Sequence, residues 1–171
     1  MLLAYADMLH APVAAADVGE KIGTVTDVIV DPETHTVLAF VIRPGGLFAG
    51  LQFVSPQDVI EYDPHALIVA SGDALVPTSD ILRAQTMLRQ HVHVLRRSVM
   101  SESGDNLGKV NNFAIDTETA GVVRYYVHAL FGQERIIPTK SIVQVTDKAF
   151  IISDTQLKVH AKHSRSAPIH N

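Results

Sequence analysis

Nine histidines are the residues of this 171-residue sequence best suited to chemistry, because an imidazole binds metals and titrates near neutral pH. His91 and His93 are two residues apart, a spacing that places both side chains on one face of a strand. A metal site generally needs a third or fourth ligand, and the spacing identifies none. The chain has no cysteine, which excludes thiolate metal sites and thiol catalysis. We therefore expect no metal and no cofactor, with a small-ligand or metal-binding regulator as one alternative.

Two carboxylate pairs, Asp31 with Glu33 and Asp116 with Glu118, could in principle perform acid–base catalysis. Each pair lies in a turn-like segment, where an aspartate accepts hydrogen bonds from the backbone of its own turn. No Gly-x-Ser-x-Gly motif is present, and the glycines of residues 44–52 match neither a P-loop nor a dinucleotide-binding fingerprint. We therefore expect turns from these carboxylates and no enzymatic activity.

A short basic stretch could contact the phosphates of RNA or of anionic lipids. It consists of Arg89, His91, His93, Arg96 and Arg97. The stretch contains no aromatic residue on which a base could stack, and the net charge of the whole chain is −4. A solvated linker is the favoured interpretation, and an RNA- or ribosome-associated factor is the alternative.

These candidates lie in a sequence that repeats itself after 85 residues. The identical pairs are Gly23/Gly108, Val25/Val110, Asp31/Asp116, Glu33/Glu118 and Thr34/Thr119. After a three-residue shortening of the second copy, Pro56 aligns with Pro138. The repeat predicts a first domain at 1–70, a connector at 71–92, a second domain at 93–154 and a tail at 155–171.

Each copy contains short β-branched runs separated by turn residues, a pattern typical of strands. Five or six such strands in about 60 residues favour a small closed or nearly closed barrel. Gly23 and Gly108 are expected at a bulge or a close approach of two backbones.

The connector contains a helix signal. Pro77 precedes Thr78, Ser79 and Asp80, any of which can cap a helix. Helical spacing then predicts a helix over 79–90. Its expected packed face consists of Ile81, Leu82, Gln85 and Leu88.

The order of motifs in the two copies resembles the PRC-barrel family. The carrying segments are 19–28, 31–34, 45–48 and 54–60 in the first copy and 103–110 and 135–138 in the second. The family is similar to the cytoplasmic part of the photosynthetic reaction centre H subunit and to the C-terminal domain of a ribosome maturation factor. Neither specific role is transferred, because the first copy stands where the maturation factor carries a different domain and no membrane helix precedes the barrel.

The resemblance implies an all-β fold with two tandem small PRC-like β-barrels joined by a short α-helical connector. It also implies a non-catalytic binding or adaptor protein that docks onto other macromolecules. A protein partner or self-association is the expected interaction, and nucleic acid and peripheral membrane contact are weaker alternatives. The resemblance also implies a bacterial protein. No apolar run approaches the length of about 20 residues that a spanning helix needs, so we expect a cytoplasmic protein with no transmembrane segment.

The two copies differ most in their second long strand. Alternation predicts that the core-facing residues are Leu38, Phe40 and Ile42 in the first copy and Val123, Tyr125 and Val127 in the second. The opposite face carries Val37, Ala39 and Val41 in the first copy and Val122, Arg124 and Tyr126, continuing to His128, in the second. An apolar outer face is seldom left in water, so the helix, the other copy or a second chain must cover Val37, Ala39 and Val41. The polar and aromatic face of the second copy is the first candidate for a partner surface.

The loop from Pro44 to Gln52 is the second candidate surface. It carries Leu47, Phe48 and Leu51 among three glycines, where the second copy is three residues shorter. Apolar side chains on such a loop can dock into a partner or close over the mouth of the barrel, and the sequence leaves both open.

Overall fold

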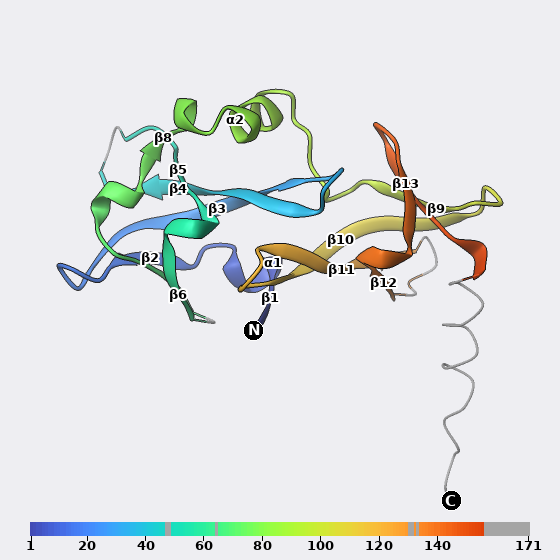
Figure 1. Ribbon diagram of the computed structural model, residues 1–171, viewed down its shortest axis with the longest axis horizontal. Coiled ribbons are helices and arrows are strands. Elements are labelled where there is room, and N and C mark those ends of the chain that lie inside the picture. The colour runs from blue at the N-terminus through green and yellow to red at the C-terminus, as the bar shows by residue number, and fades with distance from the viewer. Residues whose placement is uncertain (47–48, 64, 130–131, 133, 156–171) are drawn as a thin grey trace, which may run out of the picture.

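A computed structural model describes residues 1–46, 49–63, 65–129, 132 and 134–155. The chain is mostly β, and fourteen strands form one continuous, strongly folded sheet (Figure 1). The first repeat comprises β2 (Pro12–Ala15), β3 (Glu20–Asp31), β4 (Thr36–Pro44), β5 (Gln52–Val54), β6 (Val59–Asp63) and β7 (Ala66–Val69). The second comprises β9 (Ser98–Ser101), β10 (Asn106–Asp116), β11 (Gly121–His128), β12 (Glu134–Pro138), β13 (Ile142–Val145) and β14 (Ala149–Ile152).

The remaining strands and α-helices lie before and between the repeats: β1 (Leu2–Ala4), α1 (Tyr5–Met8), β8 (Val76–Pro77) and α2 (Leu82–Arg89). Short 3₁₀ turns lie within the repeats at Pro56–Asp58 and Thr139–Ser141 and in the connector at Gly72–Ala74 and Thr78–Asp80. Neither α-helix of the described residues has the length and apolarity needed to span a bilayer.

The two repeats share one strand topology. The first and last strands of each repeat run parallel, with Val13 opposite Leu67 in β2–β7 and Val99 opposite Phe150 in β9–β14. The long hairpins β3–β4 and β10–β11 are antiparallel. The turns of these hairpins are built alike, because the carboxylates of Asp31 and Asp116 each accept the backbone N–H two residues later at 3.0 Å. The predicted turn role of these aspartates is confirmed.

Gly23 and Gly108 also occupy the predicted kind of position. Each lies beside a bulge, where the pairing of β3 with β2 or of β10 with β9 shifts by one residue. A Cβ on Gly108 would lie 2.3 Å from the carbonyl oxygen of His128, and one on Gly23 would lie 2.6 Å from the side chain of Ile42. Gly108 also has a φ of +124°, which side-chain-bearing residues rarely adopt.

A second bulge in each hairpin corrects the predicted strand faces. Ile29 pairs with Ala39 and Val30 pairs with Val37, so Leu38 is an inserted residue. Val123 is inserted in the same way between Val122 and Arg124. One inserted residue exchanges the core-facing and outward-facing positions in the part of the strand beyond the bulge. The list of core residues therefore loses Leu38 and Val123 and gains Val37 and Val122, while Phe40, Ile42, Tyr125 and Val127 face the core as predicted.

The repeats join at the tips of their long hairpins. Thr36 pairs with Gly121, and the flanking backbone hydrogen bonds are reciprocal: Val37 N–H donates to Ala120 at 2.8 Å, and Val122 N–H donates to His35 at 2.7 Å. These residues are related by the same 85-residue offset as the repeats. The junction is therefore an internal two-fold pairing of one hairpin tip with its copy.

One apolar core runs through both repeats. It contains residues from β3, β4 and β7 of the first and from β10, β11 and β14 of the second. His35, from the first hairpin tip, enters the second repeat, where its Nδ1 lies 2.8 Å from the hydroxyl of Tyr125 and its ring lies 5.4 Å from that of Phe150. The φ of His35 is 56°, and that of its counterpart Ala120 is 54°. Both hairpin turns therefore use a left-handed residue at this position, and in the first turn it directs the imidazole into the second repeat.

The first strand lies within the predicted first domain, residues 1–70, but pairs with a strand of the second repeat. β1 pairs with β10, with Leu3 opposite Ile115, and α1 packs beside the same strand. The amino-terminal residues therefore belong to the sheet of the second repeat, although they precede the first in the sequence.

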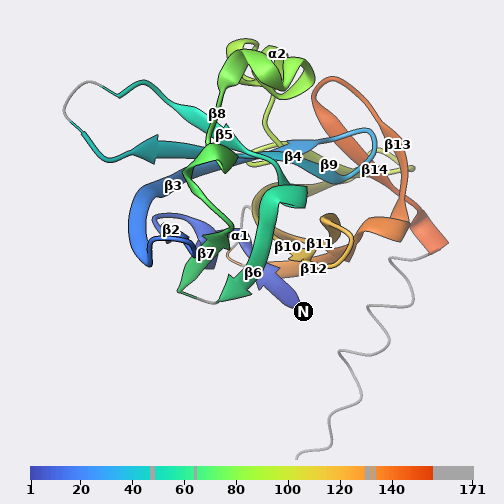
Figure 2. The same cartoon turned by 60° about the vertical axis from the view of Figure 1, so that its left-hand side comes forward.

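The connector helix is shorter than the predicted 79–90, and its packed face agrees with the predicted one in part. Ile81 and Leu88 pack against the apolar cluster that contains Ala39, Val41 and Phe53, as predicted. Thr78–Asp80 form a 3₁₀ turn, and Ile81 precedes α2 without a side-chain cap. Ala84 and Met87 are buried, whereas Leu82 is 72% exposed. Both views place α2 over β4 and β5 of the first repeat (Figures 1 and 2).

We expect Gly108→Ala to destabilise the chain by about 1–3 kcal/mol, because the new Cβ meets the backbone of His128 and adopts a positive φ. Gly45→Ala is the matched control, since a Cβ there meets nothing within 4 Å. Urea unfolding of both variants measures the difference. Equal free energies of unfolding would contradict the close backbone approach.

We expect His35 to make stability depend on pH between neutral and mildly acidic conditions. Burial lowers the pKa of His35 below its ordinary value of 6.5, with Arg97 acting in the same direction and Asp31 opposing both. The unfolded chain therefore binds the proton more readily, and stability falls as the pH drops below 6.5 toward the lowered pKa.

His35→Asn tests this expectation, because asparagine tolerates the left-handed backbone and removes the titrating ring. Urea unfolding at pH 7.5 and 5.5 should show a smaller loss on acidification for the variant than for the wild type. Identical losses would show that the other histidines account for the pH dependence.

Candidate functional site

The outer face of the first repeat is covered by α2. Ala39 and Val41 of β4 and Phe53 of β5 are at most 1% exposed and form a second apolar cluster with Ala84 and Met87. Of the three possible covers, the helix is the one found over Ala39 and Val41. Val37 lies in the main core because of the bulge at Leu38. The predicted partner-binding residues Val37, Ala39 and Val41 are thus unavailable to a partner.

The equivalent face of the second repeat is formed by β10, β11 and β12. Strand register places its side chains in three rows across the strands, and we call them together the β10–β12 face. The rows are Lys109–His128–Glu134, Asn112–Tyr126–Ile136 and Ala114–Arg124–Pro138. The predicted residues Arg124, Tyr126 and His128 therefore lie on one face, as their alternation indicated.

Residues of the β10–β12 face are exposed where their counterparts in the first repeat are buried. Ile136 is 48% exposed, and its counterpart Phe53 is 0% exposed. Tyr126 is half-buried at the position of Val41, and Arg124 is half-buried at the position of Ala39. Among the described residues, α2 packs on the first repeat, and α1 lies beside β10, where the backbone N–H of Ala6 donates to Asn112 Oδ1 at 3.3 Å. Val123 and Ile136 stay exposed beside it.

Arg124 is held against its own strand. Its guanidinium lies 5.8 Å from the centre of the Tyr126 ring, which is a cation–π distance. Its Nε is buried, and no described residue accepts a hydrogen bond from it. Among the described residues, no carboxylate forms an ion pair with Arg124.

Two apolar members of the face were missed by sequence reasoning. Val123 is 41% exposed beside Arg124, because the bulge turns it outward. Ile136 is an apolar residue of the kind usually found in a core, and its pairing with Tyr126 shows that it faces outward. Comparing the two copies could not reveal the bulge, since both copies carry it at the same position.

The basic stretch does not form one surface. Arg89, His91, His93 and Arg96 are exposed. Arg97 is only 8% exposed, lies over the ring of Phe150 at 5.2 Å and donates to the carbonyl of Thr146. Burial lowers the pKa of Arg97 from its ordinary value. The inclusion of Arg97 in an exposed basic stretch is wrong, because a cation at this place packs between the repeats.

The histidines of that stretch do not lie on a strand. His91 is in a turn with a φ of 53°, and its ring centre is 6.4 Å from that of His93. Within the described part of the chain, no three histidine or carboxylate side chains gather closely enough to hold a metal ion.

The loop from Pro44 to Gln52 is described only in part. Leu51 is 42% exposed, at the start of β5. Leu47 and Phe48, which carried most of the expectation for this loop, lie outside the described residues.

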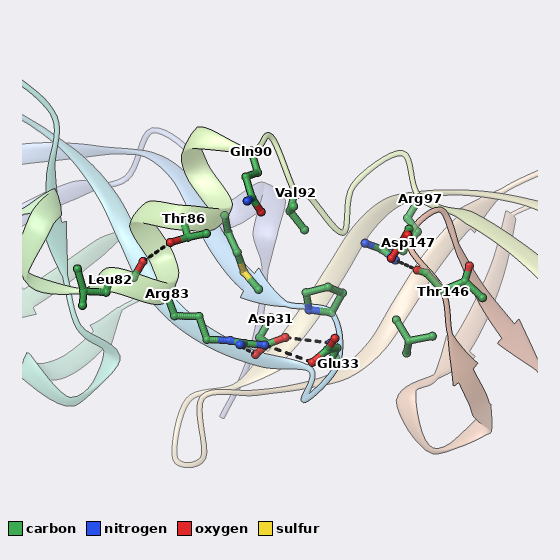
Figure 3. A pocket seen from close by; sticks show the side chains of 13 residues that line it. Asp31, Glu33, Leu82, Arg83, Thr86, Gln90, Val92, Arg97, Thr146 and Asp147 are labelled. Carbon is green, nitrogen blue, oxygen red and sulfur yellow. Dashed lines mark hydrogen bonds and ion pairs between the residues drawn. The ribbon is translucent and has the colours of Figure 1, made fainter.

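A groove of about 770 Å³ lies between the repeats (Figure 3). One wall is α2 and the β3–β4 turn, and the other is the β13–β14 turn with Arg97. Arg83 of α2 crosses the first wall, where its Nε lies 2.6 Å from Asp31 and its Nη2 lies 3.4 Å from Glu33. Both carboxylates of the turn are therefore engaged with the helix.

Asp31 is the buried member of this ion pair, with a side chain 3% exposed. Burial opposes its ionisation, but the hydrogen bonds from Arg83 and from the Glu33 backbone outweigh burial and hold the pKa of Asp31 below its ordinary 3.8. The ion pair fastens α2 to the hairpin that joins the repeats. We assign the groove a structural role for that reason.

Comparison with known proteins identifies one family. The model of the PRC-barrel domain matches residues 2–76 and 93–158, which are two segments consistent with two tandem copies. A search of curated proteins found no match.

We expect Asp31→Asn to cost about 1.5–3 kcal/mol of stability, because the amide keeps the turn hydrogen bond and loses the charged contact with Arg83. Asp116→Asn is the matched control, since this aspartate makes the same turn bond with a side chain 33% exposed, and it should cost about 0–1 kcal/mol. Urea unfolding at pH 7 measures both.

The pH gives a second test of the same ion pair. Because the pKa of Asp31 is lowered by folding, its stabilisation is present above pH 3.8 and is lost as the pH falls through the folded pKa. The difference between the wild type and Asp31→Asn should shrink in that range. A constant difference would contradict an ionic contribution.

Proposed function

This chain belongs to the PRC-barrel family, and we propose that it is a non-catalytic adaptor that binds another protein through the β10–β12 face. The observation that carries the proposal is the difference between two equivalent faces. The first repeat buries its outer face under α2. On the second repeat, Val123 and Ile136 are exposed and Tyr126 is half-buried.

The composition of the face supports a protein partner. Tyrosine and arginine are enriched among residues that dominate binding energies at protein interfaces, and Tyr126 and Arg124 occupy its centre. Exposed isoleucine and valine beside them supply apolar area. The residues lie on paired strands, so the surface is formed before the partner arrives.

The finer architecture is part of the same proposal. Each repeat, with its parallel end strands and long hairpin, is a PRC-like barrel, and α2 belongs to the connector between the two. The continuous core and the paired hairpin tips support a rigid arrangement of the barrels. The proposal places the adaptor in the cytoplasm, where a chain needs no disulfide.

RNA is a weaker partner for this chain. Arg97 packs between the repeats, so the exposed basic stretch contains only Arg89, His91, His93 and Arg96. An RNA-dependent interaction should require these residues and should weaken steeply with salt.

We expect Arg124→Ala/Tyr126→Ala to lose a partner that the wild type retains in a nuclease-treated extract of the native host. The double variant removes the two central side chains of the face, and retention should fall at least about tenfold. Quantitative mass spectrometry of the retained proteins measures the change. Thermal unfolding should show that the variant still folds.

Arg89→Gln/Arg96→Gln is the matched control, because it removes two exposed arginines outside the face. This control should retain the partner. A partner that survives Arg124→Ala/Tyr126→Ala, or that is lost with Arg89→Gln/Arg96→Gln or with nuclease, would contradict the proposal.

A further inference from the structure

We propose that the segment bound by the β10–β12 face is an acidic amphipathic α-helix of the partner protein, seated where α2 sits on the first repeat. This inference rests on the proposed function and specifies the chemistry of the partner. It follows from the internal two-fold relation, which shows what covers a face of this shape within the same molecule.

The shape argument comes from equivalent rows of residues. In the first repeat, Val41 lies between Asp27 and Phe53 across three strands, and α2 lies over this row. In the second repeat, Tyr126 lies between Asn112 and Ile136 in the same register. Three adjacent strands are about 10 Å wide, which matches the diameter of one α-helix.

The apolar argument concerns the residues that the helix would cover. Ile136 and Val123 lie on either side of the Arg124–Tyr126 pair and are 48% and 41% exposed. α2 covers the corresponding face with Ala84 and Met87, three positions apart on the helix. The partner helix accordingly needs apolar residues at i, i+3 or i+4 and i+7.

The charge argument determines the sign of the partner. In the first repeat the helix supplies the cation, Arg83, and the sheet supplies the carboxylate, Asp31. On the β10–β12 face the sheet supplies the cation at Arg124, and Lys109 carries a second positive charge in the row on the other side of Tyr126. Glu134 is the only acid in the three rows. The complementary helix therefore carries Asp or Glu beside its apolar stripe.

A second copy of this chain fits the face less well than an acidic partner does. The helix that a second copy could offer is α2, which carries Arg83 and Arg89. Both have the same sign as Arg124, so the contact would be repulsive. α2 is also held on its own first repeat by the buried cluster and by the Arg83–Asp31 pair.

The test is an mRNA-display selection of 16-residue helical peptides on the full chain, with Arg124→Glu/Ile136→Ser as the counter-selection target. We expect enriched sequences to combine an apolar stripe of helical spacing with flanking Asp or Glu. A synthesised enriched peptide should bind the wild type saturably in fluorescence anisotropy. It should bind Arg124→Glu at least about tenfold more weakly.

A charge exchange gives the sharpest control. Replacing the key acidic residue of the peptide by Arg should restore binding to Arg124→Glu and weaken binding to the wild type. NMR amide shifts on peptide binding should involve Val123, Tyr126 and Ile136 and leave α2 unchanged. Circular dichroism and thermal unfolding confirm that each variant folds.

Enriched peptides that are basic or extended, peptides unaffected by Arg124→Glu, or no enrichment would overturn the helix inference. A dimer in sedimentation that is lost in Arg124→Glu would overturn it in favour of a second copy. The failures are distinguishable: an extract partner that depends on Arg124 and Tyr126, together with extended peptides, leaves the adaptor function standing. If neither an extract partner nor a peptide depends on the face, both proposals fall.

Discussion

The reciprocal pair of backbone hydrogen bonds between the hairpin tips is the constraint on which the rest of the structure depends. Val37 N–H donates to Ala120 and Val122 N–H donates to His35, so β4 and β11 belong to one sheet. Each tip must then enter the neighbouring repeat, and His35 reaches Tyr125 and Phe150. A single core results, because neither repeat of about 60 residues could bury enough apolar surface alone.

The two-fold pairing also explains why the repeats differ in what covers them. A connector between two repeats occurs only once, so it can cover the outer face of one repeat and leave the other without it. α2 lies on the first repeat because Ala39, Val41 and Phe53 offer an apolar bed and Asp31 offers a carboxylate for Arg83. The second repeat carries Arg124, Tyr126 and Ile136 at those positions, so it would present a cation to the basic α2 where the first repeat presents Ala39.

The sequence predicted those features whose cause is local. The Asp31 and Asp116 turns follow from the bonding of aspartate to its own backbone, and Gly108 follows from a backbone contact that admits no side chain. The grouping of Arg124, Tyr126 and His128 followed from strand alternation. The repeat, read as an offset of 85 residues, indicated two copies and agrees with the two segments of the family match.

Features that depend on tertiary contacts were not predictable in this way. The bulges that turn Leu38 and Val123 away from the core leave no local signal, because an inserted valine or leucine has the composition of its strand. Arg97 is charged and follows a basic run, yet it is buried since Phe150 and the Thr146 carbonyl meet it from the far end of the repeat. The packed face of α2 was predicted only in part for the same reason: Ile81 and Leu88 pack as predicted, but Ala84 and Met87 are its buried residues and Leu82 is exposed.

The β10–β12 face carries larger and more polar side chains than its counterpart in the first repeat. Arg124 and Tyr126 stand where Ala39 and Val41 are at most 1% exposed beneath α2, and the buried Nε of Arg124 has no hydrogen-bond partner among the described residues. If this face had been selected for stability alone, we would expect small and branched apolar residues beneath a helix, as in the first repeat. Arg124 instead lies over the Tyr126 ring, an arrangement that would reduce the side-chain entropy lost if a carboxylate bound there, as the proposed function requires. The two equivalent faces of the duplicated unit thus differ in what covers them: α2 packs on the first, whereas Val123 and Ile136 of the second are exposed.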